Sequence, residues 1–413
     1  MGLGFRVVAD LPDGPQWGGR GSPELFIQNL IDRIPERLGD SDHASLVGWG
    51  SVPNGADLLL HPAEEPFELR LEGNQLFAQG KTSSAGPGYH AFLIEWLERI
   101  GSEEGFSWIW SDPAREVEDE TGYAIDRDFA KLQGEMARWF AQVAEHLLSV
   151  EADPETVFAL AMPVGFAWAG DAFALSSLGT WSREFIEEAA DGSAASGSAA
   201  SQYFPWWSKD RDADFWRNCG LVYAWTDVPW REPQGDEERR FFEVTDRCWS
   251  RARTLDPTVE LPEAEWAELR ACLSEDPPSR PEPTGIGFRR GRLTKPLTGG
   301  WGIDVPGWFL ESTEKEGTTI LFWDRTRTIR ATSFSTAGEE LPPVPDGEVT
   351  LREETREGSA EIVAVASESE SYWQLQGEMR SASSLCVITI AYEDEASRAW
   401  AIETWQSLRH REG

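Results

Sequence analysis

The stretch that decides the fold of the N-terminal half is residues 67–100, FELRLEGNQLFAQGKTSSAGPGYHAFLIEWLERI. From Phe67 to Glu72, apolar and polar residues alternate with the period of a β-strand, and Gly73-Asn74 then supplies the chemistry of a tight turn. A second short strand follows over residues 75–78. The pattern predicts a β-hairpin.

A helix is predicted soon after the hairpin. The small-residue loop 82–90 leads into apolar residues that recur at helical spacing, namely Tyr89, Phe92, Leu93, Trp96, Leu97 and Ile100. Gly101 should end this helix, because glycine adopts the left-handed cap conformation at little cost.

The other segments of the first 150 residues fit the same kind of domain. A longer helix is predicted over residues 126–149, where apolar side chains again follow a helical period. Short apolar runs at 43–49 and 56–60 are bounded by turn-forming residues, as strands are. Residues 1–150 are therefore predicted to be a mixed α/β domain.

Residues 151–275 are predicted to be mainly helical, rich in tryptophan and packed on the first domain. The low-complexity run 191–201, DGSAASGSAAS, is predicted to be a flexible loop. The aromatic run 221–230 is predicted to begin as a strand. Helices are predicted over residues 236–255 and 263–273.

A proline-rich stretch marks the clearest domain boundary. Four prolines fall between Ser274 and Gly285. Proline removes a backbone donor and restricts the chain to extended conformations. Residues 276–285 are therefore predicted to be a semi-rigid linker.

Residues 286–413 are predicted to form an antiparallel sheet covered by one helix. The strand-like segments are residues 301–306, 318–323, 326–334, 360–366, 372–377 and 385–392, and the closing helix covers 394–410. Strands followed by a helix are typical of an α+β domain. The whole chain is thus predicted to be a multi-domain α+β protein in which the N-terminal α/β region carries a helical insertion.

This C-terminal domain resembles the Mog1/PsbP/DcrB-like group in three features. The first is WGIDVPGW at 301–308, a strand broken by Pro-Gly, and the second is the pair of consecutive strands over 318–334. The third is the ending 388–408, with a strand, an acidic turn and a helix that closes in Trp-x-Ser-Leu. The resemblance implies a binding or chaperone-like module and transfers no catalytic residue. Residues 1–280 show no resemblance that we recognise.

The charge of the chain bears on its partners. The 413 residues include 37 Lys and Arg against 72 Asp and Glu, so the formal net charge is 37 − 72 = −35. A surplus of carboxylates repels phosphate, and the basic cluster at 288–295 is too short to offset it, so nucleic-acid binding is disfavoured. The acidity suits a basic protein partner, or it serves solubility alone.

Composition also bears on location and cofactors. The 4 cysteines have no CxxC spacing, which fits a reducing cytosol. Apolar runs fall short of the roughly 20 residues that cross a bilayer, and the N-terminus lacks the pattern of a secretory signal. The 5 histidines are dispersed. We expect a cytoplasmic protein with no membrane contact and no cofactor.

The loop 83–90, SSAGPGYH, is the best local candidate for catalysis. Free N–H groups at a helix N-terminus could hold an anion or oxyanion. Ser83 or Ser84 would be the nucleophile and His90 the base, with Glu95 or Asp119 orienting it. The structural alternative is a helix entry in which Ser84 caps the helix and Pro87 presets its first turn. We favour the structural alternative.

An acidic run offers a weak candidate for metal binding. Residues 116–123 are EVEDETGY, and Glu118, Asp119 and Glu120 could supply oxygen ligands to Ca²⁺ or Mg²⁺. The run lacks the alternating ligand spacing of an EF-hand, so a solvated loop is favoured.

An aromatic-rich segment offers a candidate binding surface. Its rings would form an anchor for a basic partner if they were exposed beside acidic residues. These rings are Tyr203, Trp206, Trp207, Trp216, Trp225 and Trp230. Rings of this size more often lie in a core, and that alternative is preferred.

Three functions remain open at this stage. The leading one is a non-catalytic, acidic binding factor of the immunity, adaptor or chaperone-like kind that docks on another protein, because no strong catalytic motif is present. The alternative is an enzyme, such as a hydrolase, or an anionic-ligand-binding protein with its site at residues 83–90. The third is mimicry of nucleic acid by the acidic surface.

Overall fold

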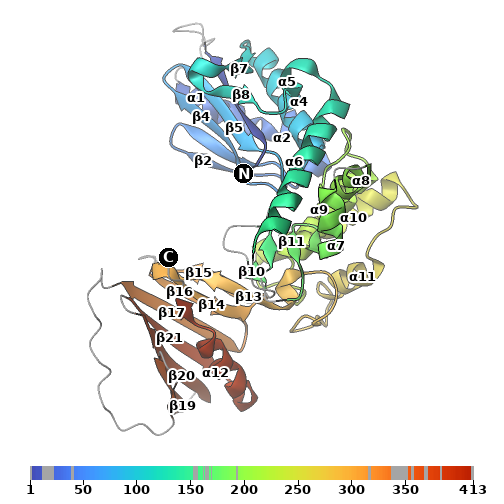
Figure 1. Ribbon diagram of the computed structural model, residues 1–413. Coiled ribbons are helices and arrows are strands. Elements are labelled where there is room, and N and C mark those ends of the chain that lie inside the picture. The colour runs from blue at the N-terminus through green and yellow to red at the C-terminus, as the bar shows by residue number, and fades with distance from the viewer. Residues whose placement is uncertain are drawn as a thin grey trace. The chain divides into compact units, whose positions relative to one another are not determined.

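The chain forms two compact units in the computed structural model (Figure 1). Unit 1 comprises Met1–Pro163, Asp171–Val228 and Arg239–Arg270, and unit 2 comprises Val164–Gly170, Pro229–Glu238 and Ala271–Gly413. The residues described by the structure are 2–11, 23–38, 41–151, 157–160, 162, 167–168, 170–191, 194–314, 318–335, 352–354, 358–366, 371–381 and 384–410. The proline-rich stretch 276–285 falls within unit 2, which also takes in Pro229–Glu238 from the region predicted to be helical.

Unit 1 is built on one antiparallel sheet with the strand order β2-β3-β4-β5-β1-β8-β7, and β6 also pairs with β1. Its strands are β1 (Gly4–Asp10), β2 (Gly48–Val52), β3 (Gly55–Leu59), β4 (Phe67–Glu72), β5 (Gln75–Lys81), β6 (Trp108–Ile109), β7 (Ser111–Asp112) and β8 (Val117–Asp119). The predicted hairpin is confirmed: Glu72 pairs with Gln75 across Gly73-Asn74. The strand predicted from residue 43 begins only at Gly48, because residues 41–44 form the short helix α3 (Ser41–Ala44).

Helix α4 (Pro87–Glu104) packs one face against this sheet. The residues of the predicted apolar stripe are buried except for Phe92, which is partly buried. The prediction that Gly101 ends the helix is wrong, since α4 continues to Glu104 and is capped by Gly105 in the left-handed conformation. Gly101 instead makes room for the returning chain: a Cβ there would lie 2.9 Å from the Phe106 carbonyl oxygen.

The remaining helices of unit 1 include several that the sequence interpretation missed. They are α1 (Pro23–Asp32), α2 (Ile34–Arg37), α5 (Tyr123–Asp126), α6 (Phe129–Ser149), α7 (Arg183–Ala190), α8 (Ala194–Tyr203), α9 (Ala213–Thr226), α10 (Asp236–Leu255) and α11 (Glu263–Ala271), and the first residues of α10 belong to unit 2. The helix predicted over 236–255 is confirmed by α10. A small sheet of β9 (Phe158–Ala159), β11 (Ala174–Ser176) and β12 (Gly179–Trp181) completes the unit.

Two predictions in this region are wrong. Most of the run predicted to be a flexible loop is α8, in which Ala199 and Ala200 are fully buried, and alanine has the best intrinsic helix propensity. The aromatic run predicted to start as a strand continues α9, which begins after Asp212, whose side chain accepts the Phe215 N–H at 2.9 Å. Residues 192–193 lie outside the described residues.

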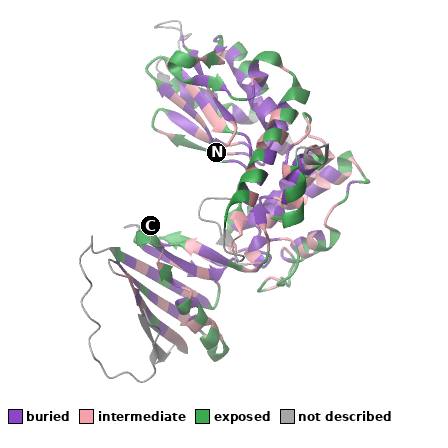
Figure 2. Ribbon diagram, in the orientation of Figure 1, coloured by how far each residue is buried: buried purple, intermediate pink, exposed green. Residues whose placement is uncertain are grey.

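Unit 2 contains an antiparallel sheet with the order β15-β16-β17-β21-β20-β19-β18. Its strands are β15 (Leu310–Thr313), β16 (Thr319–Trp323), β17 (Arg327–Ser335), β18 (Arg352–Glu354), β19 (Gly358–Ala366), β20 (Ser371–Arg380) and β21 (Ser384–Tyr392). Buried and more exposed residues alternate along β21, as in a strand with one covered face (Figure 2). Helix α12 (Arg398–Gln406) supplies the cover and fully buries Ala401 and Trp405.

The predicted C-terminal sheet proves to be two sheets. The strand predicted at 301–306 is β14 (Trp301–Pro306), which pairs with β13 (Arg292–Pro296) and β22 (Arg409–His410) in a separate sheet that β10 (Ala167–Trp168) also joins. The closing helix is shorter than predicted, because residues 395–397 form a 3₁₀ turn. Helices and several antiparallel sheets together confirm the α+β class.

Candidate functional site

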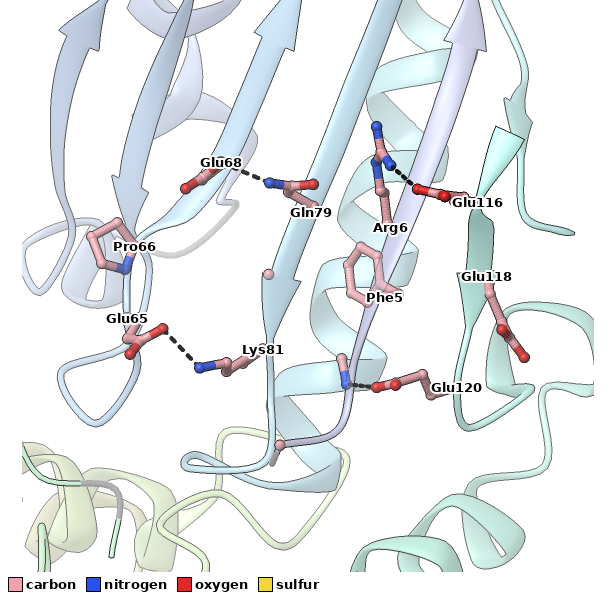
Figure 3. A pocket seen from close by; sticks show the side chains of 13 residues that line it. Phe5, Arg6, Glu65, Pro66, Glu68, Gln79, Lys81, Glu116, Glu118 and Glu120 are labelled. Carbon is pink, nitrogen blue, oxygen red and sulfur yellow. Dashed lines mark hydrogen bonds and ion pairs between the residues drawn. The ribbon is translucent and has the colours of Figure 1, made fainter. Parts of the chain in front are cut away.

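A groove of about 440 Å³ lies on the sheet of unit 1 (Figure 3). Side chains of a strand point alternately to its two faces, so Arg6 points to the face opposite the buried Val7. The groove crosses β4, β5, β1 and β8 and is lined by Gly2, Gly4, Phe5, Arg6, Glu65, Pro66, Glu68, Gln79, Gly80, Lys81, Glu116, Glu118 and Glu120.

Acidic side chains dominate this groove. Glu116, Glu118 and Glu120 follow one side of it, and Glu65 and Glu68 follow the other. Against these five carboxylates stand two cations, so the local formal charge is 2 − 5 = −3. Sequence reasoning noticed only the carboxylates near β8, since the other side of the groove comes from a segment some fifty positions earlier.

Both cations of the groove are already paired. The Arg6 guanidinium lies 3.5 Å from Glu116, and the Lys81 ammonium lies 3.3 Å from Glu65. Glu120 accepts the Gly4 N–H at 2.7 Å. Within the residues that the structure describes, the Glu118 carboxylate has no hydrogen-bond or ion-pair partner. The unneutralised charge of the groove is therefore negative.

His90 of α4 is fully buried. Its Nδ1 is 2.9 Å from Thr82 Oγ1, while its Nε2 is 3.0 Å from Thr121 Oγ1 and 3.1 Å from Asp119 Oδ1. The ring also makes an edge contact with Phe5, which lines the groove. Both ring nitrogens are thus engaged with buried partners.

The predicted nucleophile and base are not brought together. In the described part of the chain, no hydrogen bond joins Ser83 or Ser84 to His90, whose neighbours are threonines and Asp119. Glu95 points elsewhere, with its carboxylate 2.8 Å from the Lys209 ammonium and 3.2 Å from the Tyr123 hydroxyl. The arrangement is that of a buried structural imidazole.

Asp119 is held in its charged form inside the unit. Burial alone would raise the pKa of this carboxyl, but the hydrogen bond and charge of His90, together with the N–H groups of Ala124 and Thr121, lower the pKa to about 2. The Ala124 N–H donates to Oδ2 at 2.7 Å and the Thr121 N–H to Oδ1 at 3.0 Å. Asp119 therefore anchors His90 and the turn after β8.

The acidic run does not form a metal site. Along β8 the side chains alternate, so Glu118 faces the groove while Asp119 faces the interior, and Glu120 bonds to the Gly4 N–H. Among the side chains that the structure describes, no group of three His, Cys, Asp or Glu residues could hold a metal ion. The period of the strand separates carboxylates that are adjacent in the sequence.

The anion predicted at the start of α4 is supplied by the chain itself. Glu64 Oε1 accepts the Ser84 N–H at 2.6 Å and the Ala85 N–H at 2.7 Å. The expectation that Ser84 caps the helix is wrong, because the N-cap residue is Gly86 and makes no side-chain cap bond. Pro87 does occupy the first turn. Gly88 is required by packing, since a Cβ there would lie 2.1 Å from the Trp206 ring.

The predicted aromatic binding surface is not an exposed patch. Tyr203, Trp206, Trp216 and Trp230 are at most 2% exposed. Trp206, for example, stacks on Phe92 at 5.4 Å, measured between ring centroids, and Trp207 and Trp225 are partly buried. These rings fill the interior because burying each removes a large apolar area from water.

Comparisons with known proteins give little further guidance. No family model and no curated protein matches the chain. A solved structure from Bacteroides thetaiotaomicron VPI-5482 matches at 12% identity and a TM-score of 0.22, covering 28% of this chain and 47% of that one. This chain thus spans about half the length of that protein. The Ran-binding protein Mog1p of Saccharomyces cerevisiae matches at 12% identity and a TM-score of 0.21, covering 29% of this chain and 95% of that one. At these scores neither match defines a function.

Of the helices that lie in the described residues, none is both long and apolar enough to cross a membrane.

Proposed function

We propose that the chain is a non-catalytic binding protein whose groove on unit 1 docks a basic segment of a partner protein. The observation that carries the proposal is the charge of the groove, where five carboxylates face two cations that are already paired. A Lys or Arg side chain placed beside Glu118 would meet an unneutralised carboxylate. Charge complementarity of this kind steers encounter and selects partners.

The enzymatic alternative has less support. A serine nucleophile needs a base within hydrogen-bond reach, and the ring nitrogens of His90 already face Thr82, Thr121 and Asp119. The N–H groups that could stabilise an oxyanion are already bonded to Glu64. The likeness of residues 286–413 to the Mog1/PsbP/DcrB-like group remains a prediction, and it assigns that segment a binding role of the adaptor or chaperone-like kind.

The test uses hexalysine as a probe and compares two variants of equal net charge. In the first, Glu118→Gln and Glu120→Gln remove two carboxylates of the groove. In the second, Glu145→Gln and Glu188→Gln remove two exposed carboxylates from α6 and α7. Both variants change the formal charge from −35 to −33. Because exposed ion pairs are each worth roughly 0.2–1 kcal/mol, the loss of two should make the groove variant bind about two- to thirtyfold more weakly than the wild type.

The control variant should bind hexalysine as the wild type does. Affinity should also fall as salt is raised, since exposed charges are screened. The proposal fails if the full-length wild type does not bind hexalysine at low salt, or if both variants lose affinity equally.

A further inference from the structure

Glu64 connects two loops at the edge of the groove. It lies in the turn of residues 61–66, between β3 and β4, and its carboxyl bonds to the N–H groups of Ser84 and Ala85, just before α4. The whole residue is only 7% exposed. One buried side chain thus fastens residues 61–66 to the start of the helix.

The second carboxyl oxygen of Glu64 lacks such support. Oε2 is buried and has no hydrogen-bond partner among the described residues. The titratable groups that couple to it are Tyr89 of α4 and Tyr203 of α8, both buried, and Glu65 in its own turn. His61, in the same turn, stays neutral because burial lowers its pKa to about 3. Charge on Oε2 is therefore poorly stabilised.

The two protonation states of the buried Glu64 carboxyl differ in free energy. Burial raises the pKa of this carboxyl to about 7, although the N–H groups of Ala85 and Ser84 act in the opposite direction, and Glu65 adds to the increase. The neutral carboxyl still has an oxygen to accept both N–H groups. The ionised carboxyl accepts them more strongly but leaves a charged oxygen out of water, and the second effect is the larger one.

We propose that Glu64 is a proton-controlled latch: when neutral it holds residues 61–66 on the start of α4, and when ionised it releases them toward water. Glu65 and Pro66 belong to the same turn and line the groove (Figure 3). Opening the latch would therefore loosen one side of the groove. The latch does not depend on the proposed function, but its effect on partner binding rests on it.

Hydrogen exchange of the full chain tests the latch. The readout is the protection of the Ser84 and Ala85 amides, corrected for the intrinsic effect of pH on exchange. With a carboxyl pKa near 4.5 in the open form and about 7 in the closed form, linkage makes opening about tenfold more favourable at pH 8 than at pH 6. Protection should fall by the same factor.

Two variants sharpen the test. Glu64→Gln keeps an oxygen that can accept both N–H groups but cannot ionise, so its corrected protection should be the same at pH 6 and pH 8. Glu65→Gln alters the neighbouring charge only and should keep a pH-dependent loss. Unchanged protection in the wild type, or an equal loss in Glu64→Gln, overturns the latch.

If Glu64→Gln does not fold, a titration of the wild type still tests the proposal. The ¹³C resonance of the Glu64 carboxyl should then titrate near pH 7, and titration near pH 4.5 overturns the proposal. A latch found in a protein that does not bind hexalysine would leave this inference standing and overturn only the proposed function.

Discussion

The two units differ in the balance of charged side chains that they bury. Unit 1 buries carboxyl and imidazole groups, namely Glu64, Asp119, His43, His61 and His90, together with Arg37. In the described residues, unit 2 buries the arginines Arg231, Arg290 and Arg327 and the carboxylate of Glu238. Carboxyl and imidazole groups change charge between acid and neutral pH, whereas a guanidinium stays charged throughout.

The buried arginines of unit 2 contact groups that stabilise a positive charge. Arg231 donates to both oxygens of Glu238, at 2.6 and 2.9 Å, and to the Trp308 carbonyl oxygen. Arg290 lies 4.0 Å from the centre of the Trp230 ring. A guanidinium that cannot lose its proton must be paired or stacked when it is buried.

In unit 1, burial and hydrogen bonding instead set the pKa values of the buried groups. Burial lowers the pKa of His43 to about 3 and raises that of Glu64 to about 7, while hydrogen bonds and the charge of His90 overcome burial and lower the pKa of Asp119 to about 2. The comparison predicts a response to pH from these groups of unit 1 that the buried arginines of unit 2 cannot give.

The largest expected loss of stability follows from breaking a buried ion pair in unit 2. Arg231→Met leaves the Glu238 carboxylate buried without its cation, which should cost about 3–5 kcal/mol in the free energy of unfolding. Arg292→Met removes an exposed pair with Glu403 and should cost at most about 1 kcal/mol. Urea unfolding followed by hydrogen exchange in peptides of unit 2 measures both. Equal losses would contradict the contrast between buried and exposed pairs.

The next effect tests whether His90 is structural. His90→Ala removes the hydrogen-bond partner of Asp119, Thr82 and Thr121 inside unit 1, so it should cost about 3 kcal/mol. Thermal unfolding would show this as a marked fall in the melting temperature. An unchanged melting temperature would favour a catalytic imidazole over a structural one.

A smaller effect on stability is expected at acid pH. The pKa of Asp119 is lowered to about 2 in the folded state, from an ordinary value of 3.8. The folded state therefore holds this proton less tightly than the unfolded state. The stabilisation that comes from this lowered pKa amounts to about 2 kcal/mol. It is fully present above pH 4 and is lost as the pH falls through 2. Unfolding of unit 1 should show a shallower loss between pH 4 and pH 2 in Asp119→Asn than in the wild type, and parallel curves would contradict the assignment.

The smallest effect concerns the groove. Glu118 has an exposed carboxylate on β8, so Glu118→Gln should change the free energy of unfolding by less than about 0.5 kcal/mol. The same variant should weaken hexalysine binding by at most about fivefold. Calorimetric unfolding and fluorescence anisotropy measure the two quantities. A large loss of stability would place Glu118 in the fold and not in binding.

Local patterns succeeded where neighbouring residues decide the structure. The hairpin over β4 and β5 and the bounds of α10 follow from alternation, turn chemistry and helical period. The candidate site was only partly predictable. The segments 83–90 and 116–123 were both noticed, but their roles depend on Glu64 and on the pairing of β1 with β5 and β8, which are distant in sequence.

The misassigned segments share a physical cause. The start of α9 depends on one capping side chain at Asp212, and α8 is stabilised by burying Ala199 and Ala200 in the core of unit 1. Helical stability in proteins comes mainly from tertiary packing, so composition alone could not separate these helices from a loop or a strand.

The amino-acid sequence by itself determined the α+β class, the hairpin, helices such as α4 and α10, and the acidity of the chain, because these depend on composition and on residues close together. Only the tertiary structure decided that Ser83 and Ser84 lack a base, that Trp206, Trp216 and Trp230 are interior and that five glutamates share one groove. Those properties depend on which distant strands become neighbours, and on whether a polar group brought inside finds a partner.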